Sequence, residues 1–205
     1  MRKIVLKAAL ISTTLIATGC VSVLPDPEPA NVIYRLDVAG EKSETNLSAP
    51  IIRIDRPTAA RLVGTRKIIV SPDAQRLAVA GGAEWADSLP NMVQKALVDK
   101  MSTYNAITGV MPSAGAKSDY RVHVNIDNFE ARFDNGEDNA PLILISYSTT
   151  LADVNTRELL GSRQFSESRR SSSASVSSIV STMNGANDKL MQDMSNWMSG
   201  LTTIY

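Results

Sequence analysis

The sequence contains a single cysteine, few aromatic residues and no excess of charge of either sign. One Cys among 205 residues excludes an internal disulfide and a zinc site built from several thiolates. Lys and Arg total 21, Asp and Glu total 21, and aromatic residues make up 5% of the chain. The chain therefore lacks the basic surface and the stacking side chains of a nucleic-acid-binding protein, and we expect no nucleic-acid partner.

The motifs of common enzymes are also absent. His123 is the only histidine, it falls on the polar side of an expected strand, and no G-x-S-x-G pattern accompanies it. No dinucleotide-binding or phosphate-loop glycine pattern occurs, and Asp134, Glu137 and Asp138 lack the ligand spacing of a calcium loop. We interpret His123 as a surface residue and the acidic stretch as a solvated turn, and we expect no catalytic residue, no cofactor and no metal site.

A long hydrophobic run is missing as well, although a short one stands near the N-terminus. The run from Ala8 to Ile16 follows three basic residues and is well below the roughly 20 residues that a membrane-spanning helix requires. A basic segment, a short apolar core and then small residues are typical of an export signal. We therefore expect residues 1–19 to be a signal peptide rather than a permanent membrane helix.

The five residues that end at Cys20, Ile-Ala-Thr-Gly-Cys, resemble a bacterial lipobox, with Ala17 at the usual leucine position. We expect cleavage before Cys20 and attachment of fatty acyl chains such as palmitate to its sulfur, which anchors a protein without a spanning helix. The alternative is an ordinary secretory signal that is cleaved elsewhere. Val21 follows the cysteine, and by the familiar sorting rule for lipoproteins a residue other than Asp indicates the periplasmic face of the outer membrane.

The rest of the chain is expected to form a tether and one domain. Residues 20–30 carry proline at three alternate positions, which favours an extended polyproline-like path. Residues 31–205 contain no low-complexity break, so we expect a single domain. Alternating apolar residues, with a bulge near Asn128, and two stripes at helical spacing predict the following elements: strands at 32–38, 51–54, 67–70, 76–80, 106–110, 120–133, 142–151 and 159–166, and helices from about 88 to 104 and from 176 to 201.

The predicted fold class is α/β (α+β): a mixed, largely antiparallel sheet with two main amphipathic helices packed on it. In their order and spacing, several short motifs resemble the ABC-type transport auxiliary lipoprotein family over nearly the whole mature chain. They are the lipobox at Cys20, Tyr34-Arg35-Leu36, Ile68-Ile69-Val70-Ser71-Pro72, Trp85 before its helix, Asp119-Tyr120-Arg121-Val122 and a C-terminal helix that ends around Trp197.

This resemblance implies a binding role, because the family has no catalytic motif to transfer. Its members partner MCE-domain proteins, including the paraquat-inducible type, in systems that move lipids between the inner and outer membranes. We therefore expect a non-catalytic outer-membrane lipoprotein that docks onto an MCE-type tunnel and that could form a ring-like homo-oligomer through exposed edge strands. The alternative is a lipoprotein that regulates envelope assembly or a cell-wall synthase by protein contact.

Overall fold

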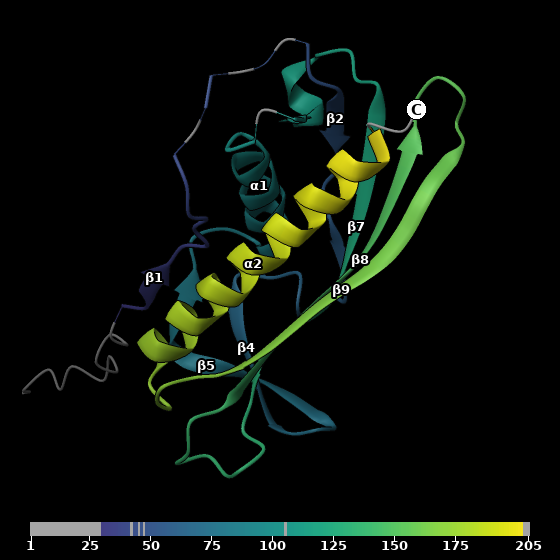
Figure 1. The fold of residues 1–205 in the computed structure, drawn as a ribbon. Helices are drawn as coiled ribbons and strands as arrows, with labels where there is room; N and C mark the ends of the chain where they lie inside the picture. The colour runs from purple at the N-terminus through teal and green to yellow at the C-terminus, as the bar shows by residue number, and fades with distance from the viewer. Residues whose placement is uncertain (1–29, 42, 45, 47, 105, 203–205) are drawn as a thin grey trace, which may run out of the picture.

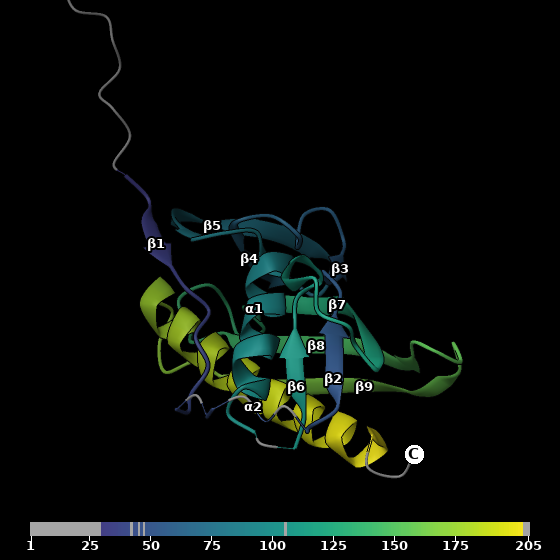
Figure 2. The same ribbon diagram turned by 90° about the horizontal axis from the view of Figure 1, so that it is seen from above.

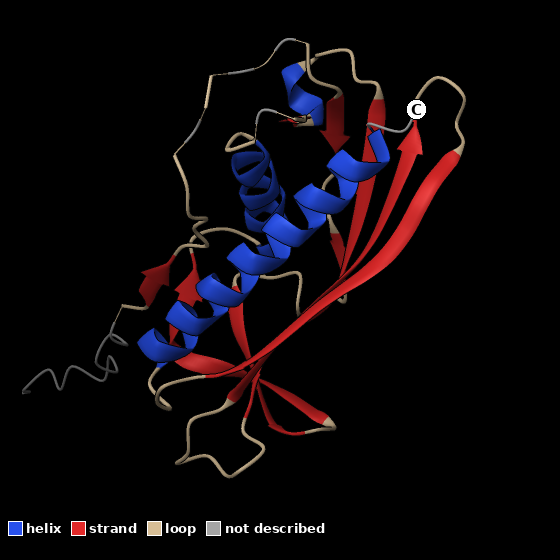
Figure 3. Ribbon diagram, viewed as in Figure 1, coloured by secondary structure: helices blue, strands red, loops and turns tan. Residues whose placement is uncertain are grey.

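The computed structural model describes residues 30–41, 43, 44, 46, 48–104 and 106–202. Within these ranges two long helices pack on one face of a nine-stranded sheet (Figures 1 and 3). The helices are α1 (Leu89–Met101) and α2 (Val176–Thr202). The strands are β1 (Val32–Tyr34), β2 (Ile51–Ile54), β3 (Thr58–Ala59), β4 (Lys67–Asp73), β5 (Arg76–Trp85), β6 (Thr108–Val110), β7 (Tyr120–Arg132), β8 (Leu142–Asp153) and β9 (Leu159–Arg170).

Strand β7 is the centre of the sheet because both of its edges are occupied along most of its length. On one side β8 pairs with it from Tyr120 to Arg132, and β9 extends the meander on the far side of β8. On the other side β2, β3 and β4 lie one after another along β7. Alternate β7 residues from Tyr120 to Ile126 are buried against the helices, as their period of two predicts.

The expectation of a largely antiparallel sheet is wrong, since the sheet is mixed and mostly parallel. Five of the eight pairings among the described strands are parallel, and three are antiparallel. The loops that connect β4 to β5, β7 to β8 and β8 to β9 contain no helix, and such direct connections give antiparallel neighbours. The chain reaches β7 from β2, β3 and β4 only after α1, and such a crossover allows parallel pairing.

Most predicted elements are confirmed, with changes at their ends. The bulge near Asn128 is present, as the register of β7 against β8 shifts between Ile126 and Asn128. Strand β1 is shorter than expected, whereas β5 continues through the Gly81-Gly82 pair, where Gly82 has a φ of 68°. The two-residue β3 and a short 3₁₀ helix at Pro112–Ala114 carry no pattern that predicts them.

The core lies between the helices and the sheet and includes the methionines of α2. The rings of Trp85 and Phe129 meet edge to face, with centroids 5.9 Å apart. Four methionines of α2 are fully buried in this core: Met183, Met191, Met194 and Met198.

One buried hydrogen bond joins α2 to the sheet inside this core. The hydroxyl of Tyr147 in β8 donates to Asn187 Oδ1 in α2 over 2.7 Å, and both side chains are fully buried. Burial raises the pKa of Tyr147 well above its ordinary value, so the hydroxyl remains a donor at neutral pH. Asn187 Nδ2 has no hydrogen-bond partner among the described residues. The bond from Tyr147 therefore offsets most of the free energy that it costs to bury the Asn187 amide.

We expect Tyr147→Phe to lower the free energy of unfolding by about 1–3 kcal/mol, because Asn187 Oδ1 is then buried without a donor. Adding Asn187→Leu to Tyr147→Phe should recover part of this loss, since the unpaired amide is removed with its partner. Urea unfolding followed by circular dichroism measures both effects. Equal stability of Tyr147→Phe and the unmodified chain would contradict this account of the bond.

Candidate functional site

The segment of residues 35–40, here called the strap, connects β1 to the rest of the domain across both helices. Its backbone bonds to side chains of α2 instead of to another strand. Asn184 Oδ1 accepts from the Asp37 amide over 3.1 Å, and Asn184 Nδ2 donates to the Arg35 carbonyl over 3.3 Å. A single amide side chain thus occupies both the donor and the acceptor positions that a neighbouring strand would supply.

A buried cation fixes the next part of the strap. Lys100 of α1 is only 4% exposed, and its Nζ lies 2.7 Å from Asp188 Oδ1 of α2 and 2.7 Å from the Ala39 carbonyl oxygen. The same carboxylate oxygen accepts from the Ala39 amide over 2.7 Å. A buried ammonium is tolerated only with such partners, so α1, α2 and the strap are held together at this point.

The strap has an apolar side and a polar side, as an extended chain does. Leu36 and Val38 are half-buried and pack against the core, whereas Arg35 and Asp37 are exposed. This alternation explains why the sequence predicted one strand over 32–38. Only 32–34 pairs with another strand, and the remainder keeps the extended backbone on the helices.

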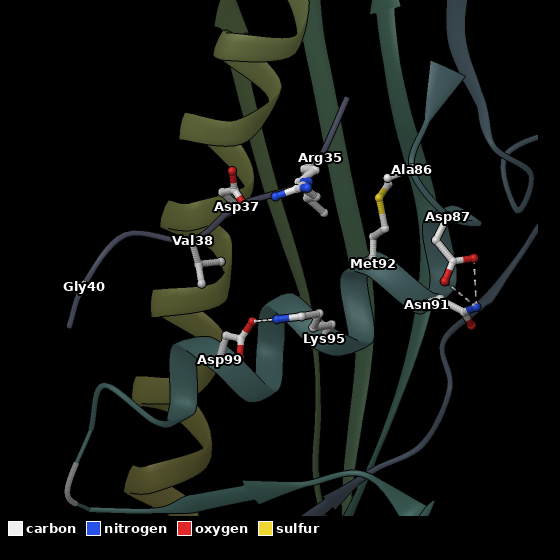
Figure 4. A pocket seen from close by; sticks show the side chains of 11 residues that line it. Arg35, Asp37, Val38, Gly40, Ala86, Asp87, Asn91, Met92, Lys95 and Asp99 are labelled. Carbon is white, nitrogen blue, oxygen red and sulfur yellow. Dashed lines mark hydrogen bonds and ion pairs between the residues drawn. The ribbon is translucent and has the colours of Figure 1, made fainter. Parts of the chain in front are cut away.

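A cleft of about 410 Å³ lies between the strap, the residues that follow β5, and α1 (Figure 4). Its polar side chains are largely engaged with one another. Lys95 forms an ion pair with Asp99 one turn along α1, and Asn91 Nδ2 donates to both carboxylate oxygens of Asp87 over 3.1 and 3.0 Å. The Asn91 side chain, followed by the Ser88 amide, holds the pKa of Asp87 below its ordinary value, so Asp87 is charged at neutral pH.

The side chains described so far make anchoring and packing contacts. No group of three or more potential metal ligands occurs in the described part of the chain. His123 is an exposed residue, as predicted, with Nε2 3.5 Å from Thr58 Oγ1. The acidic stretch forms the β7–β8 turn as predicted, and there Asp134 is paired with Arg170.

The sequence predicts a lipid attachment site at Cys20 but gives no indication of the strap. Cys20 and the tether up to residue 29 lie outside the described residues, so acylation of Cys20 and the boundaries 1–19 and 20–30 stay predictions. The strap depends on Asn184 and Asp188, four residues apart on one face of α2 and about 150 positions away in the sequence. Their spacing is visible in the sequence, but nothing local indicates what they bind.

In the part of the chain that is described, neither helix has the length and apolar character to cross a bilayer. The sequence model of a family described as "ABC-type transport auxiliary lipoprotein component" matches residues 34–195. An uncharacterized protein from Bradyrhizobium diazoefficiens is 24% identical over 147 residues, which are 71% of this chain. The chain spans 38% of the length of that relative.

Two solved structures share the fold. A protein from Xanthomonas campestris of the DUF330 family has a TM-score of 0.75 at 21% identity, over 84% of this chain and 97% of its own. A hypothetical protein from Chlamydia trachomatis has a TM-score of 0.52 at 7% identity, over 77% of this chain and 100% of its own. These likenesses show the fold, and the family match extends from the end of β1 into α2. The chain therefore belongs to the ABC-type transport auxiliary lipoprotein component family.

Proposed function

We propose that this protein is a non-catalytic lipoprotein that is anchored through Cys20 at the periplasmic face of the outer membrane and docks an MCE-domain protein of a lipid-transporting ABC system. The observation that carries the proposal is the attachment of the N-terminal chain through β1 and the strap. An auxiliary component whose anchor lies N-terminal to its domain needs such a fixed junction, and the family membership supplies the transport context.

The junction is suited to hold a tethered domain. Figure 2 shows β1, the first described strand, at the outside of the sheet, where it pairs with β5. The Ala86 amide donates to the Tyr34 carbonyl over 2.7 Å, and the strap bonds to Asn184 and Asp188 follow directly. A force along the tether is therefore distributed over β5, α1 and α2 rather than over one strand pair.

The contact with the partner is proposed to use β9. Among the described residues β9 pairs only with β8, so a twelve-residue edge of backbone donors and acceptors faces outward. Charged side chains at Arg163, Glu167 and Arg169 discourage unspecific pairing with other strands, which is how natural proteins protect long edges. Leu159, at the start of the strand, is 63% exposed and adds an apolar contact.

We expect Cys20→Ser to release the protein from the membrane fraction, because the serine hydroxyl does not become the thioether that carries the acyl chains. Fractionation of cells followed by mass spectrometry of the mature N-terminus measures this. Asp26→Ala, in the same tether, serves as the control and should remain in the membrane fraction. A soluble native protein with an unmodified thiol at residue 20 would overturn the anchor.

The docking surface is tested by placing a photo-crosslinking amino acid at Ser168, which is exposed on β9. We expect this position to capture an MCE-domain protein, identified by mass spectrometry, in intact cells. The same amino acid at Glu137, in the exposed β7–β8 turn, is the matched control and should capture little. Capture of cell-wall synthesis proteins instead would favour the alternative role in envelope assembly, and equal capture at both positions would exclude β9 as the specific contact.

The junction itself is tested by Asp188→Asn, which leaves the buried Lys100 without an anionic partner. We expect the free energy of unfolding to fall by about 1–3 kcal/mol, a loss that is limited because Asp188 is partly exposed. We also expect faster tryptic cleavage after Arg35, because the strap is held less firmly. Asp193→Asn is the control, since Asp193 pairs with the exposed Lys189 on the surface of α2. Identical cleavage rates for the two variants would show that the Lys100–Asp188 pair does not hold the strap.

A further inference from the structure

Three arginines surround a hollow on the face of the sheet that the helices leave uncovered. The hollow has a volume of about 470 Å³ and is formed by β2, the start of β7, the end of β8 and the β8–β9 turn. Three of its six lining residues are Arg53, Arg121 and Arg157. It is separate from the cleft beneath the strap and shares no lining residue with it.

Two of these arginines occupy directly opposite positions in neighbouring strands. Arg53 of β2 is in register with Arg121 of β7, and Arg121 is in register with Ala152 of β8. Paired residues point to the same face of a sheet, and like charges directly opposite one another are unfavourable. The core does not require this pair, because the residues that face the helices here are Ile52, Ile54 and Val122, the neighbours of the arginines in sequence.

The carboxylates near the hollow do not neutralise the three guanidinium groups. Asp55 is shared, since it forms an ion pair with Arg121 and lies 3.6 Å from Arg53 Nε. That Nε is buried and has no hydrogen-bond partner among the described residues. A second carboxylate, Asp153, lines the hollow and remains charged, and its Oδ1 accepts from the Asn155 and Thr156 amides over 2.7 and 2.8 Å. Two carboxylates thus face three guanidinium groups, which leaves one positive charge in excess.

The third arginine sits at a position that disfavours its residue type. Arg157 has a φ of 62° and is the only non-glycine residue with a positive φ in the described chain. Asn and Gly adopt this left-handed conformation more readily than Arg does. The fold of the β8–β9 turn therefore gives no reason for an arginine at 157, whereas the hollow that it lines does.

We infer that this hollow is a binding site for a phosphate group, either of a phospholipid headgroup or of a free phosphate ion. Guanidinium groups bind phosphate oxygens through pairs of charge-assisted hydrogen bonds, and three of them suit a tetrahedral anion better than a single carboxylate. The site lies away from the strap, because Gly161, which follows the β8–β9 turn, lies against Trp197 and Leu201 in the last turns of α2, whereas the strap contacts Asn184 and Asp188. The inference does not rest on the docking of an MCE-domain protein.

The test compares the unmodified full-length chain with its Arg157→Asn variant, both in non-ionic detergent. This substitution removes the charge and suits the left-handed backbone. The probes are inorganic phosphate, measured by equilibrium dialysis, and water-soluble dihexanoyl phosphatidylglycerol, measured by native mass spectrometry. We expect Arg157→Asn to weaken binding at least about threefold, and added salt to weaken it further, because the site is partly exposed to solvent. Arg61→Gln is the control; it removes an exposed charge outside the hollow and should bind as the unmodified chain does.

Binding of both probes supports recognition of the phosphate group itself. Binding of phosphatidylglycerol alone identifies a lipid headgroup as the source, and binding of inorganic phosphate alone identifies the free ion. The inference is overturned when neither probe binds, or when Arg157→Asn and Arg61→Gln reduce binding equally. Binding of a hexa-aspartate peptide in place of both probes also overturns it, in favour of an acidic protein partner. The melting temperature of Arg157→Asn should equal or exceed that of the unmodified chain, which separates loss of binding from loss of folding.

Discussion

The buried ammonium group of Lys100 determines how the N-terminal chain is joined to the domain. Lys100 belongs to α1, its carboxylate partner Asp188 belongs to α2, and its second acceptor, the carbonyl oxygen of Ala39, belongs to the strap. A charge with this little exposure must retain both partners, so none of the three segments can shift independently of the others. These polar contacts fix where the strap lies along the helices, and so they position Leu36 and Val38 on the core. The apolar contacts of Leu36 and Val38 alone would not specify one register of the strap against the helices.

The elements of this fold could be predicted where local pattern and burial agree. The period of two in β7 and the apolar stripe of α2 each reflect one buried face, and the shift near Asn128 reveals the bulge because the parity of the apolar residues changes there. The parallel pairings of β2, β3 and β4 could not be predicted. Strands of two to seven residues have the same local pattern whichever way they run beside β7, and their direction is set by connections through α1 and the loops.

The functional part of the molecule was predictable only where chemistry requires a motif. Cleavage and acylation need small residues before a cysteine, so Cys20 stands out in the sequence and stays a prediction. The strap and the arginine-lined hollow need no motif, because each is assembled from residues that are distant in sequence. Arg53, Arg121 and Arg157 come from three segments and resemble ordinary surface charges until the register of β2 on β7 brings two of them together.

The positions of these features along α2 limit how a tethered domain can work. Asn184 and Asp188 bind the strap in the first half of the helix, whereas the start of β9 lies against its last turns. A helix of 27 residues is about 40 Å long, and the predicted polyproline-like tether of residues 20–30 would add roughly 30 Å. In the proposed arrangement, with Cys20 anchored in a membrane, the start of β9 and the arginine-lined hollow would lie at the other end of α2 from the strap, to which the tether is joined. The proposed anchor and the proposed phosphate site would therefore act at opposite ends of the domain, and a phosphate group in the hollow would not need to come from the bilayer that holds Cys20.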